Sequence, residues 1–221
     1  TAYEIYQCDW SSDVCSSDLL ANGHWTYTLD NAHPAVQALP AGVTMSDTIT
    51  VTSEDGTATQ VITITITGTN DVPTVSAALE ETAAEGDTAF TADLLAGASD
   101  LDDGETATLS VMDVTYAVDG GAESGTAPAG ISLSGSTLSV DPTDPAFDHL
   151  AVGDSTTIVV SYGIMDAQGA IMAQTETITI TGTNDVPTVS AALEETSAEG
   201  DTAFTADRKS TRLNSSHTDI S

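Results

Sequence analysis

Apolar residues and threonine alternate along two stretches of the chain, residues 48–52 (TITVT) and 61–67 (VITITIT). Successive side chains of a β-strand point to opposite faces, so this period of two predicts strands with one buried and one wet face. Further strands are predicted at residues 107–118, 131–140, 156–162 and 171–180, between turns rich in Gly, Asp and Pro. Many short strands separated by such turns predict an all-β chain built from sandwiches.

The chain contains an internal repeat. Residues 63–92 recur as residues 177–206, at a spacing of 114 positions, with one change from Ala83 to Ser197. A weaker echo relates residues around Asp55 to residues around Asp166 at a spacing of 111 positions. Repetition at a fixed spacing is typical of a tandem array of similar domains.

The repeat spacing predicts one complete unit flanked by two truncated ones. The C-terminal part of one repeat covers residues 20–72, the complete repeat residues 73–186, and the start of the next residues 187–206. Each flanking piece lacks strands that a complete sandwich needs. Residues 75–84 contain Ala, Leu and Glu, which favour a helix. We nevertheless predict an extended segment there, because it follows a proline where an immunoglobulin-like domain places its first strand.

Both ends of the chain differ in composition from the rest. Residues 1–19 contain DWSSDVCSSDL, which resembles one translated frame of a common sequencing-library adapter. Residues 207–221 contain DRKSTRLNSSH, which resembles the reverse complement of that adapter. Both cysteines lie in the first segment and all three basic residues in the second. We therefore interpret residues 20–206 as the biological sequence, and cysteine count gives no information about redox compartment.

The negative charge of the chain limits the classes of molecule that can bind it. Six of the 34 Asp and Glu residues lie in the two ends, which leaves 28 acids and no Lys or Arg in residues 20–206. Nucleic acids and anionic membrane surfaces are poor partners, because both need Lys or Arg to offset phosphate. No apolar stretch approaches the roughly 18 residues of a membrane helix, so we expect no membrane insertion. Repulsion among carboxylates favours divalent cations or high salt as the neutralising partner.

The sequence TITITGTNDVP, at residues 63–73 and again at 177–187, resembles the signature of the VCBS and cadherin-like repeats of large bacterial RTX-type adhesins. Residues 24–73 are similar to the end of a VCBS unit, and the complete repeat is similar to a cadherin-like unit with SDLDDGE near its start. The resemblance implies tandem immunoglobulin-like or cadherin-like β-sandwiches, type I secretion and a location on the bacterial cell surface. It implies a stalk in cell adhesion or biofilm, with neighbouring repeats as partners.

Several Asn and Asp residues are candidate ligands for calcium, because their side chains offer oxygen atoms. Calcium takes roughly six to eight oxygen ligands from carboxylates, amides, backbone carbonyls and water. The junction sequence GTNDVP supplies an Asn and an Asp twice, the SDLDDGE stretch supplies the densest acidic cluster, and two aligned turns supply one Asp each. The candidates are Asn70, Asp71, Asn184, Asp185, Asp100, Asp102, Asp103, Asp55 and Asp166. The alternative is a metal-free turn, because Asn and Asp also hydrogen-bond the local backbone.

Other functions have weaker support. We expect no enzyme, because the histidines fall at unrelated positions and neither GxSxG nor HExxH occurs. A glycan- or protein-binding module of the same surface protein is an alternative, with Trp25 and Tyr27 as a candidate sugar-stacking pair. Their spacing of two places both on one face of a strand, so we expect them to be buried in a core instead. A spacer in a large secreted toxin or enzyme is a further alternative.

Overall fold

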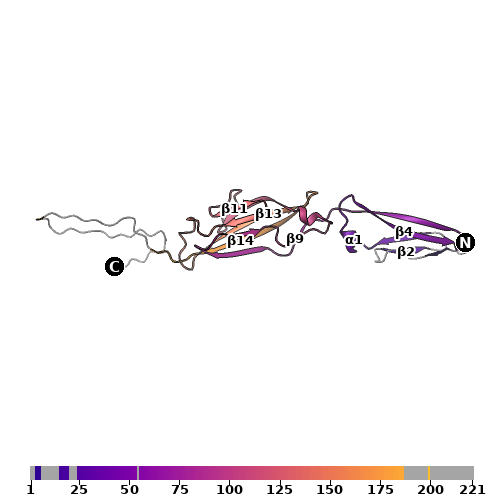
Figure 1. Cartoon of the computed structure of the whole chain (residues 1–221), viewed down its shortest axis with the longest axis horizontal. Helices are drawn as coiled ribbons and strands as arrows, with labels where there is room; N and C mark the ends of the chain where they lie inside the picture. Colours follow the sequence, from indigo (N-terminus) through magenta and orange to yellow (C-terminus); the bar gives the residue numbers. More distant parts are fainter. Residues whose placement is uncertain (1–2, 6–14, 20–23, 54, 187–198, 200–221) are drawn as a thin grey trace. The chain divides into compact units, whose positions relative to one another are not determined.

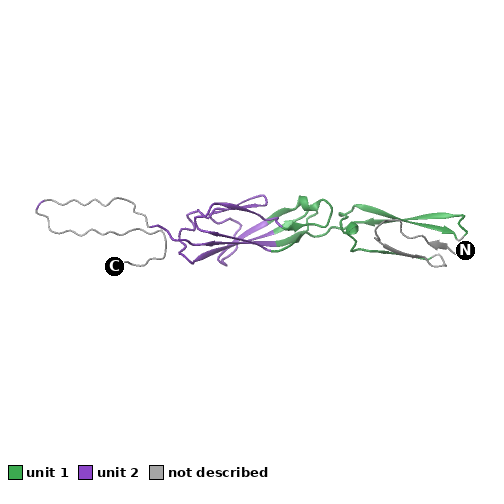
Figure 2. Ribbon diagram, turned by 60° about the horizontal axis from the view of Figure 1, so that its bottom comes forward, with its two compact units in different colours: residues 1–77, 97–112, 163–173 green, residues 78–96, 113–162, 174–221 purple. Residues whose placement is uncertain are grey.

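The computed structural model describes residues 3–5, 15–19, 24–53, 55–186 and 199. The chain divides into two compact units, shown in Figure 2. The first comprises residues 1–77, 97–112 and 163–173, and the second comprises residues 78–96, 113–162 and 174–221. Most of the predicted third repeat at residues 187–206, and the adapter-like segment at 207–221, lie outside the described residues.

Strands dominate the described residues, as Figure 1 shows, which confirms the all-β fold class. The strands are β1 (Tyr3–Ile5), β2 (Cys15–Leu19), β3 (Trp25–Leu29), β4 (Thr44–Ser53), β5 (Thr59–Thr67), β6 (Thr74–Val75), β7 (Leu79–Ala84), β8 (Phe90–Asp93), β9 (Ala98–Ser99), β10 (Ser110–Val118), β11 (Ile131–Ser134), β12 (Thr137–Val140), β13 (Ser155–Met165) and β14 (Ile171–Thr181). Two short helical segments accompany them, α1 (Pro34–Gln37) and the 3-10 helix η1 (Glu105–Thr108). None of the described helices is long and apolar enough to span a membrane.

In the first unit, the longest antiparallel ladder joins β4 to β5, from the pair Thr44 and Thr67 to the pair Thr52 and Thr59. The predicted alternation is present, since Ile49 and Ile66 are buried while the threonines between them are mostly exposed. β4 also pairs with β1, and β3 pairs with β2. Residues within the first 19 positions thus supply one neighbouring strand to β4 and one to β3.

The second unit contains the larger core. Strands β11, β12 and β8 form one sheet, and a second sheet runs in the order β10, β13, β14, β7. Inward residues of both sheets are almost completely inaccessible, namely Leu138, Val140, Ile158, Val160, Ile178 and Ile180. The hydroxyl of Tyr162 on β13 donates a 2.8 Å hydrogen bond to the Leu94 carbonyl just after β8. Two sheets that bury facing side chains form the β-sandwich that the sequence predicts.

Several local predictions need correction. Residues 131–140 form a hairpin rather than one strand, because Gly135 adopts a φ of 62° and reverses the chain. The predicted strand at 107–118 begins with η1 and becomes extended only at Ser110. Trp25 does lie on a strand, but 46% of its surface is exposed, because β3 belongs to a two-stranded sheet. Residues 75–84 are extended as predicted apart from a bend at residues 76–77, and β7 pairs in parallel with β14.

Gly182, at the end of the complete repeat, has no space for a side chain. An added Cβ would lie 2.4 Å from the Ala151 carbonyl oxygen and 2.7 Å from the Leu150 Cβ. Gly182→Ala should therefore lower the free energy of unfolding by about 1–3 kcal/mol, the usual range for overpacking. Gly125→Ala is the control, because nothing lies within 4 Å of its added Cβ. Chemical denaturation of both variants checks this prediction, and equal stabilities would contradict it.

Candidate metal centre

Three acids from separate parts of the sequence meet in the first unit. Asp100 follows β9, Glu105 opens η1 and Asp166 follows β13. One carboxylate oxygen from each residue lies within 4.8 Å of the other two. Glu105 and Asp166 are buried, and Asp100 is half-buried. Like charges held this close are unfavourable in an interior unless something neutralises them.

Asp166 is held in place by a dense set of donors. Its Oδ1 accepts hydrogen bonds from the backbone N–H groups of Gln168 (2.9 Å) and Ala170 (2.8 Å). Its Oδ2 accepts a 2.8 Å hydrogen bond from the side-chain amide of Asn70. Burial alone would raise the pKa of Asp166, but these hydrogen bonds outweigh it and lower the pKa. Asp166 is therefore a fixed, charged carboxylate tied to the junction sequence.

Asp102 also accepts a hydrogen bond from the junction sequence. It is 2% exposed, and its Oδ2 accepts a 2.8 Å hydrogen bond from the backbone N–H of Asp71. Its own backbone N–H donates to Asp100 Oδ1 at 2.9 Å. Burial, followed by the charges of Asp102 and Asp100, raises the pKa of Asp71. The junction residues and the acidic cluster are thus neighbours in space.

The segment from Asp100 to Asp103 forms a turn. The turn follows from the hydrogen bond between Asp102 and Asp100, because an Asp that accepts from the residue two positions on closes a local turn. Asp103 is exposed, and its backbone N–H donates to the Ala38 carbonyl at 3.1 Å. The structure therefore places Asp100 and Asp102 inward and leaves the side chain of Asp103 at the surface.

Glu105 was not among the sequence candidates, although it ends the SDLDDGE stretch. Its Oε1 accepts a 2.6 Å hydrogen bond from the side-chain amide of Gln168. Burial is the largest influence on its pKa and raises it, the hydrogen bond from Gln168 opposes this, and the charges of Asp102, Asp100 and Asp166 raise it further. The tertiary structure makes Glu105 part of the centre by starting a 3-10 helix at that residue.

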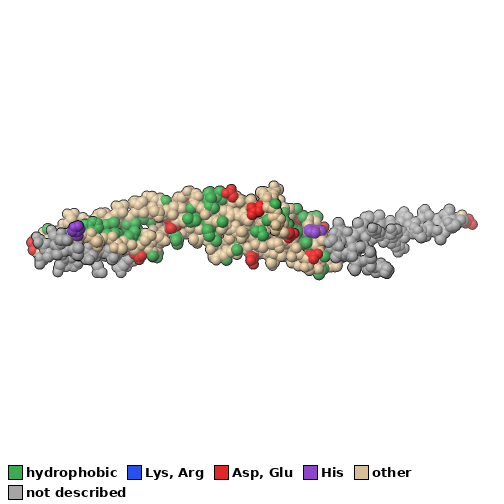
Figure 3. Space-filling view, turned by 180° about the vertical axis from the view of Figure 1, so that it is seen from behind, with side chains coloured by type: hydrophobic (Ala, Val, Ile, Leu, Met, Phe, Trp, Pro, Cys, Tyr) green, Lys and Arg blue, Asp and Glu red, His purple; other side chains and the backbone are tan. Residues whose placement is uncertain are grey.

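Several buried side-chain oxygens around the acidic centre accept no hydrogen bond from the described residues. They are Asn70 Oδ1, Asp100 Oδ2, Asp102 Oδ1 and Glu105 Oε2. A buried acceptor without a donor is costly. The described residues include many carboxylates but neither Lys nor Arg. Figure 3 shows acidic side chains on one face of the molecule. An oxygen-rich, uncompensated site of this kind fits a hard divalent cation such as Ca²⁺.

The second copy of the junction lies in the second unit. The side-chain amide of Asn184 donates to the Asp185 carbonyl at 3.2 Å, as that of Asn70 donates to the Asp71 carbonyl at 2.8 Å. Glu85, which was not among the predicted ligands, accepts a 2.9 Å hydrogen bond from the Thr183 backbone N–H. Glu85 Oε1 and Asp185 Oδ2 are buried without a partner in the described residues. Recurrence of Glu85 as Glu199 was the available sequence signal.

Asp55 occupies a different kind of position from its aligned counterpart Asp166. Its Oδ1 accepts hydrogen bonds from the Ser53 hydroxyl, the Thr57 hydroxyl and the Thr57 backbone N–H, at 2.6, 2.8 and 3.1 Å. These bonds, led by the one from Ser53, lower its pKa to about 2. Asp55 is exposed and closes the turn between β4 and β5. It is not in the acidic group formed by the described residues.

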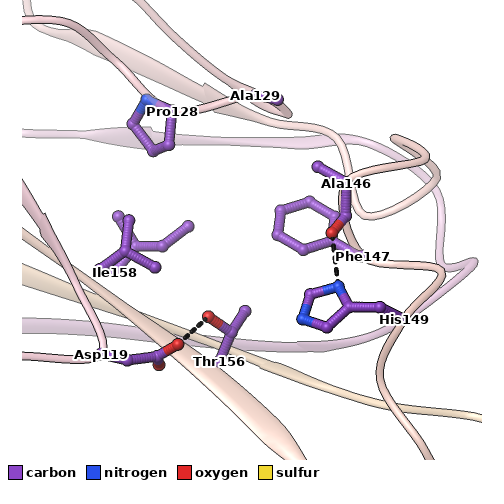
Figure 4. Close-up of a pocket in the computed structure, with 9 residues that line it drawn as sticks. Asp119, Pro128, Ala129, Ala146, Phe147, His149, Thr156 and Ile158 are labelled. Carbon is purple, nitrogen blue, oxygen red and sulfur yellow. Dashed lines mark hydrogen bonds between the residues drawn. The ribbon is translucent and has the colours of Figure 1, made fainter. Parts of the chain in front are cut away.

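The second unit also contains a small pocket (Figure 4). It has a volume of about 160 Å³ and is lined mainly by apolar side chains, including Phe147, Pro128 and Ile158. Asp119 at its rim is already engaged by the Thr156 hydroxyl and the Thr157 backbone N–H. Pockets for small ligands have volumes of roughly 300–1,000 Å³. Size and polar pairing therefore do not favour a glycan site here.

Comparison with solved structures finds protocadherin extracellular domains and titin domains. The extracellular cadherin domains 1–4 of protocadherin gamma B7 are 16% identical, over 84% of this chain and 42% of that chain, with a TM-score of 0.42. Domains 1–3 of protocadherin gamma C5 are 12% identical, over 90% of this chain and 63% of that chain, with a TM-score of 0.43. The titin domains Z1Z2 in complex with telethonin give 14% identity, 78% and 74% coverage, and a TM-score of 0.29.

This chain therefore spans 42% and 63% of those two protocadherin structures. No protein-family model matches the chain, and no curated protein matches it. Similarity at these identities and TM-scores assigns no function, so the functional inference rests on the geometry of the acidic centre.

Proposed function

We propose that the chain is part of the stalk of a secreted bacterial surface adhesin, in which calcium at repeat junctions stiffens the array. The supporting observation is the set of buried, unpartnered oxygens at the junction, provided by Asn70, Asp100, Asp102 and Glu105. These oxygens and the carboxylate of Asp166 would hold the ion. The bound ion would supply positive charge that offsets the repulsion among the carboxylates.

The residues of the chain explain why such an ion would act on the junction. Asn70 and Asp71 precede Pro73 in the segment between two predicted repeats, and each already donates a hydrogen bond to an acid of the centre. Asp166 and Asp102, which accept those bonds, lie in loops of the predicted complete repeat. With the ion bound, the same acids are neutralised and the segment is held against them. Without it, mutual repulsion of the acids weakens this attachment.

Function at this level is mechanical rather than catalytic. Neighbouring repeats of the same chain are the direct partners, outside the cell, and adhesion to a host or matrix glycan or protein is assigned to other parts of the molecule. Extracellular calcium modules have dissociation constants on the order of 0.1–1 mM. Ion binding at a hundredfold excess over such a constant would stabilise the folded chain by about 2.7 kcal/mol.

Thermal unfolding of the full chain tests this proposal. We expect millimolar calcium to raise the melting temperature relative to excess chelator, and magnesium at the same concentration to raise it much less. Asp166→Asn should remove most of the calcium effect. The matched control is Asp55→Asn, which alters an aligned acid outside the centre and should leave the calcium effect intact. An unchanged melting temperature in calcium would leave a metal-independent spacer.

A further inference from the structure

Asp-Gly pairs occur three times in the chain, at residues 55–56, 103–104 and 119–120. Such a pair can rearrange without an enzyme, because the main-chain nitrogen of the glycine can attack the side-chain carboxyl carbon of the aspartate. Glycine favours this attack, since it has no side chain to block a close approach of the backbone. The reactivity of each pair then depends on how firmly the structure holds the two reacting groups.

The structure holds both reacting groups of the pair at residues 55–56. Hydrogen bonds from Ser53 and Thr57 converge on Oδ1 of Asp55. The backbone N–H of Gly56 donates a 2.7 Å hydrogen bond to the Ser53 carbonyl, so the attacking nitrogen is engaged as well. Attack by Gly56 would break these bonds, and their loss makes the rearrangement slow at this pair.

At residues 119–120 the structure holds the carboxylate by both of its oxygens. Asp119 Oδ1 accepts a 2.7 Å hydrogen bond from the Thr157 backbone N–H, and Oδ2 accepts a 3.0 Å hydrogen bond from the Thr156 hydroxyl. Asp119 also donates its own N–H to the Thr157 carbonyl at 2.8 Å. The carboxyl carbon of Asp119 is therefore fixed against β13 and is not free to swing toward the Gly120 nitrogen.

The pair at residues 103–104 has neither kind of restraint. Both residues are exposed. Within the described part of the chain, the Asp103 carboxylate accepts no hydrogen bond and the Gly104 N–H donates none. Nothing lies within 4 Å of a Cβ added to Gly104, so the space beside its nitrogen is open. Of the three pairs, this one alone presents both reacting groups without a hydrogen bond.

We infer that the peptide bond between Asp103 and Gly104 is a spontaneous isomerisation site, at which the chain converts to an isoaspartate link that disables the adjacent acidic centre. The Gly104 nitrogen bonds to the side-chain carboxyl carbon of Asp103, while the amide proton and the carboxyl hydroxyl leave together as water. Water then opens the resulting succinimide ring at either carbonyl. Opening at the main-chain carbonyl routes the chain through the side chain as isoaspartate, and opening at the side-chain carbonyl restores aspartate. Water is the only co-reactant, and the mass of the chain is unchanged.

An isoaspartate link at this place would distort the acidic centre, because residues 103–104 separate two of its acids. The backbone N–H of Glu105 donates a 3.1 Å hydrogen bond to the Asp102 carbonyl, which closes the turn across these two residues. The new link adds one methylene to the main chain inside that turn, so the hydrogen bond loses its geometry. Glu105 would then no longer be aligned with Asp100 and Asp166. This consequence rests on the proposed role of the centre in binding calcium.

Ageing of the full chain at neutral pH, warm but well below its melting temperature, tests this inference. Peptide mapping with electron-transfer fragmentation distinguishes isoaspartate from aspartate at each of the three pairs. We expect isoaspartate to accumulate about tenfold faster at position 103 than at positions 55 and 119, because one or two hydrogen bonds must be lost at the other pairs. In guanidinium chloride those bonds are absent, and the three rates should become similar. Equal rates in the folded chain, or no isoaspartate at position 103, would overturn the inference.

Two substitutions at position 103 isolate the ring-closing chemistry. Asp103→Glu keeps the negative charge but must close a larger ring, so no isomerised product is expected on the same timescale. Asp103→Asn closes the same succinimide ring with loss of ammonia in place of water, and should convert faster than the wild type. Isomerisation of Asp103→Glu at the wild-type rate would exclude the succinimide route.

The effect on the acidic centre is measured on the same aged samples. The calcium-induced rise in melting temperature should shrink in the wild type in proportion to its isoaspartate content, and should persist in aged Asp103→Glu. An undiminished rise in isomerised chain would show that the link does not disable the centre. A fresh chain that does not respond to calcium would instead contradict the proposed function, while the ranking of the three pairs would still be tested by mass spectrometry.

Discussion

Replacing Glu176 with isoleucine is expected to stabilise the chain by about 3 kcal/mol above about pH 8, and by much less near about pH 4.5. Glu176 lies on β14 between Gln174 and Ile178, is 0% exposed, and neither of its carboxylate oxygens has a partner in the described residues. A buried charge without a partner is among the most destabilising features that a core can contain. The preceding repeat has Ile62 at the equivalent position, so an isoleucine there is compatible with this strand.

The direction of the pH dependence follows from the pKa. Burial first, and then the charges of Glu81 and Glu80 on β7, raise the pKa of Glu176 from 4.5 to about 7. The folded chain therefore holds this proton more tightly than the unfolded chain. The stability that comes from the protonated group is present below about pH 4.5, declines as the pH rises through about 7, and is lost above it. Tyr162 on β13, whose pKa is raised to about 12 by burial and then by Glu176 and Asp93, stays neutral throughout.

Urea unfolding of the wild type and Glu176→Ile across this pH range measures the effect. The difference between the two proteins isolates Glu176, because all other carboxylates titrate in both. Glu176→Gln is a second variant that removes the charge and keeps the shape. Glu123→Gln, at an exposed acid outside the strands, is the control and should leave the pH profile unchanged. A constant difference between wild type and Glu176→Ile at every pH would contradict the titration of this group.

Substitutions that remove a negative charge from the acidic centre are expected to raise the melting temperature without calcium and to lower it with calcium. In excess chelator, Asp102→Asn and Glu105→Gln should raise the melting temperature, because each removes one of several crowded carboxylates. Burial and neighbouring charges already raise the pKa of Glu105, which indicates that its ionised form is disfavoured. In millimolar calcium the same substitutions should lower the melting temperature relative to wild type, because an amide is a weaker ligand than a carboxylate.

The matched control for this reversal is Asp103→Asn. Asp103 belongs to the same acidic stretch but is exposed. The melting temperature of the Asp103→Asn variant should therefore equal that of the wild type in chelator and in calcium. Differential scanning calorimetry of the three variants in chelator, calcium and magnesium makes the comparison. Substitutions that destabilise equally in chelator and in calcium would mean that Asp102 and Glu105 act only through their hydrogen bonds to Asp71 and Gln168.

The sequence by itself determined the strands and the equivalence of the repeats. Alternation with a period of two is a local property, so β4, β5 and β14 could be recognised from their own residues. Extending the repeat by one residue aligns Glu176 with Ile62, but the structure was needed to show that this acid is buried. Composition indicated a cation, because 28 acids without Lys or Arg cannot be neutralised within residues 20–206.

Only the tertiary structure decided which acids converge. Glu105 and Asp166 are 61 positions apart and share a site because η1 and the turn after β13 are brought together by the pairing of distant strands. Asp103 and Asp55 have the same local chemistry as the acids of the centre, yet one points to the surface and the other closes its own turn. Burial and partners depend on contacts between segments far apart in sequence, and strand periodicity contains no information about those contacts.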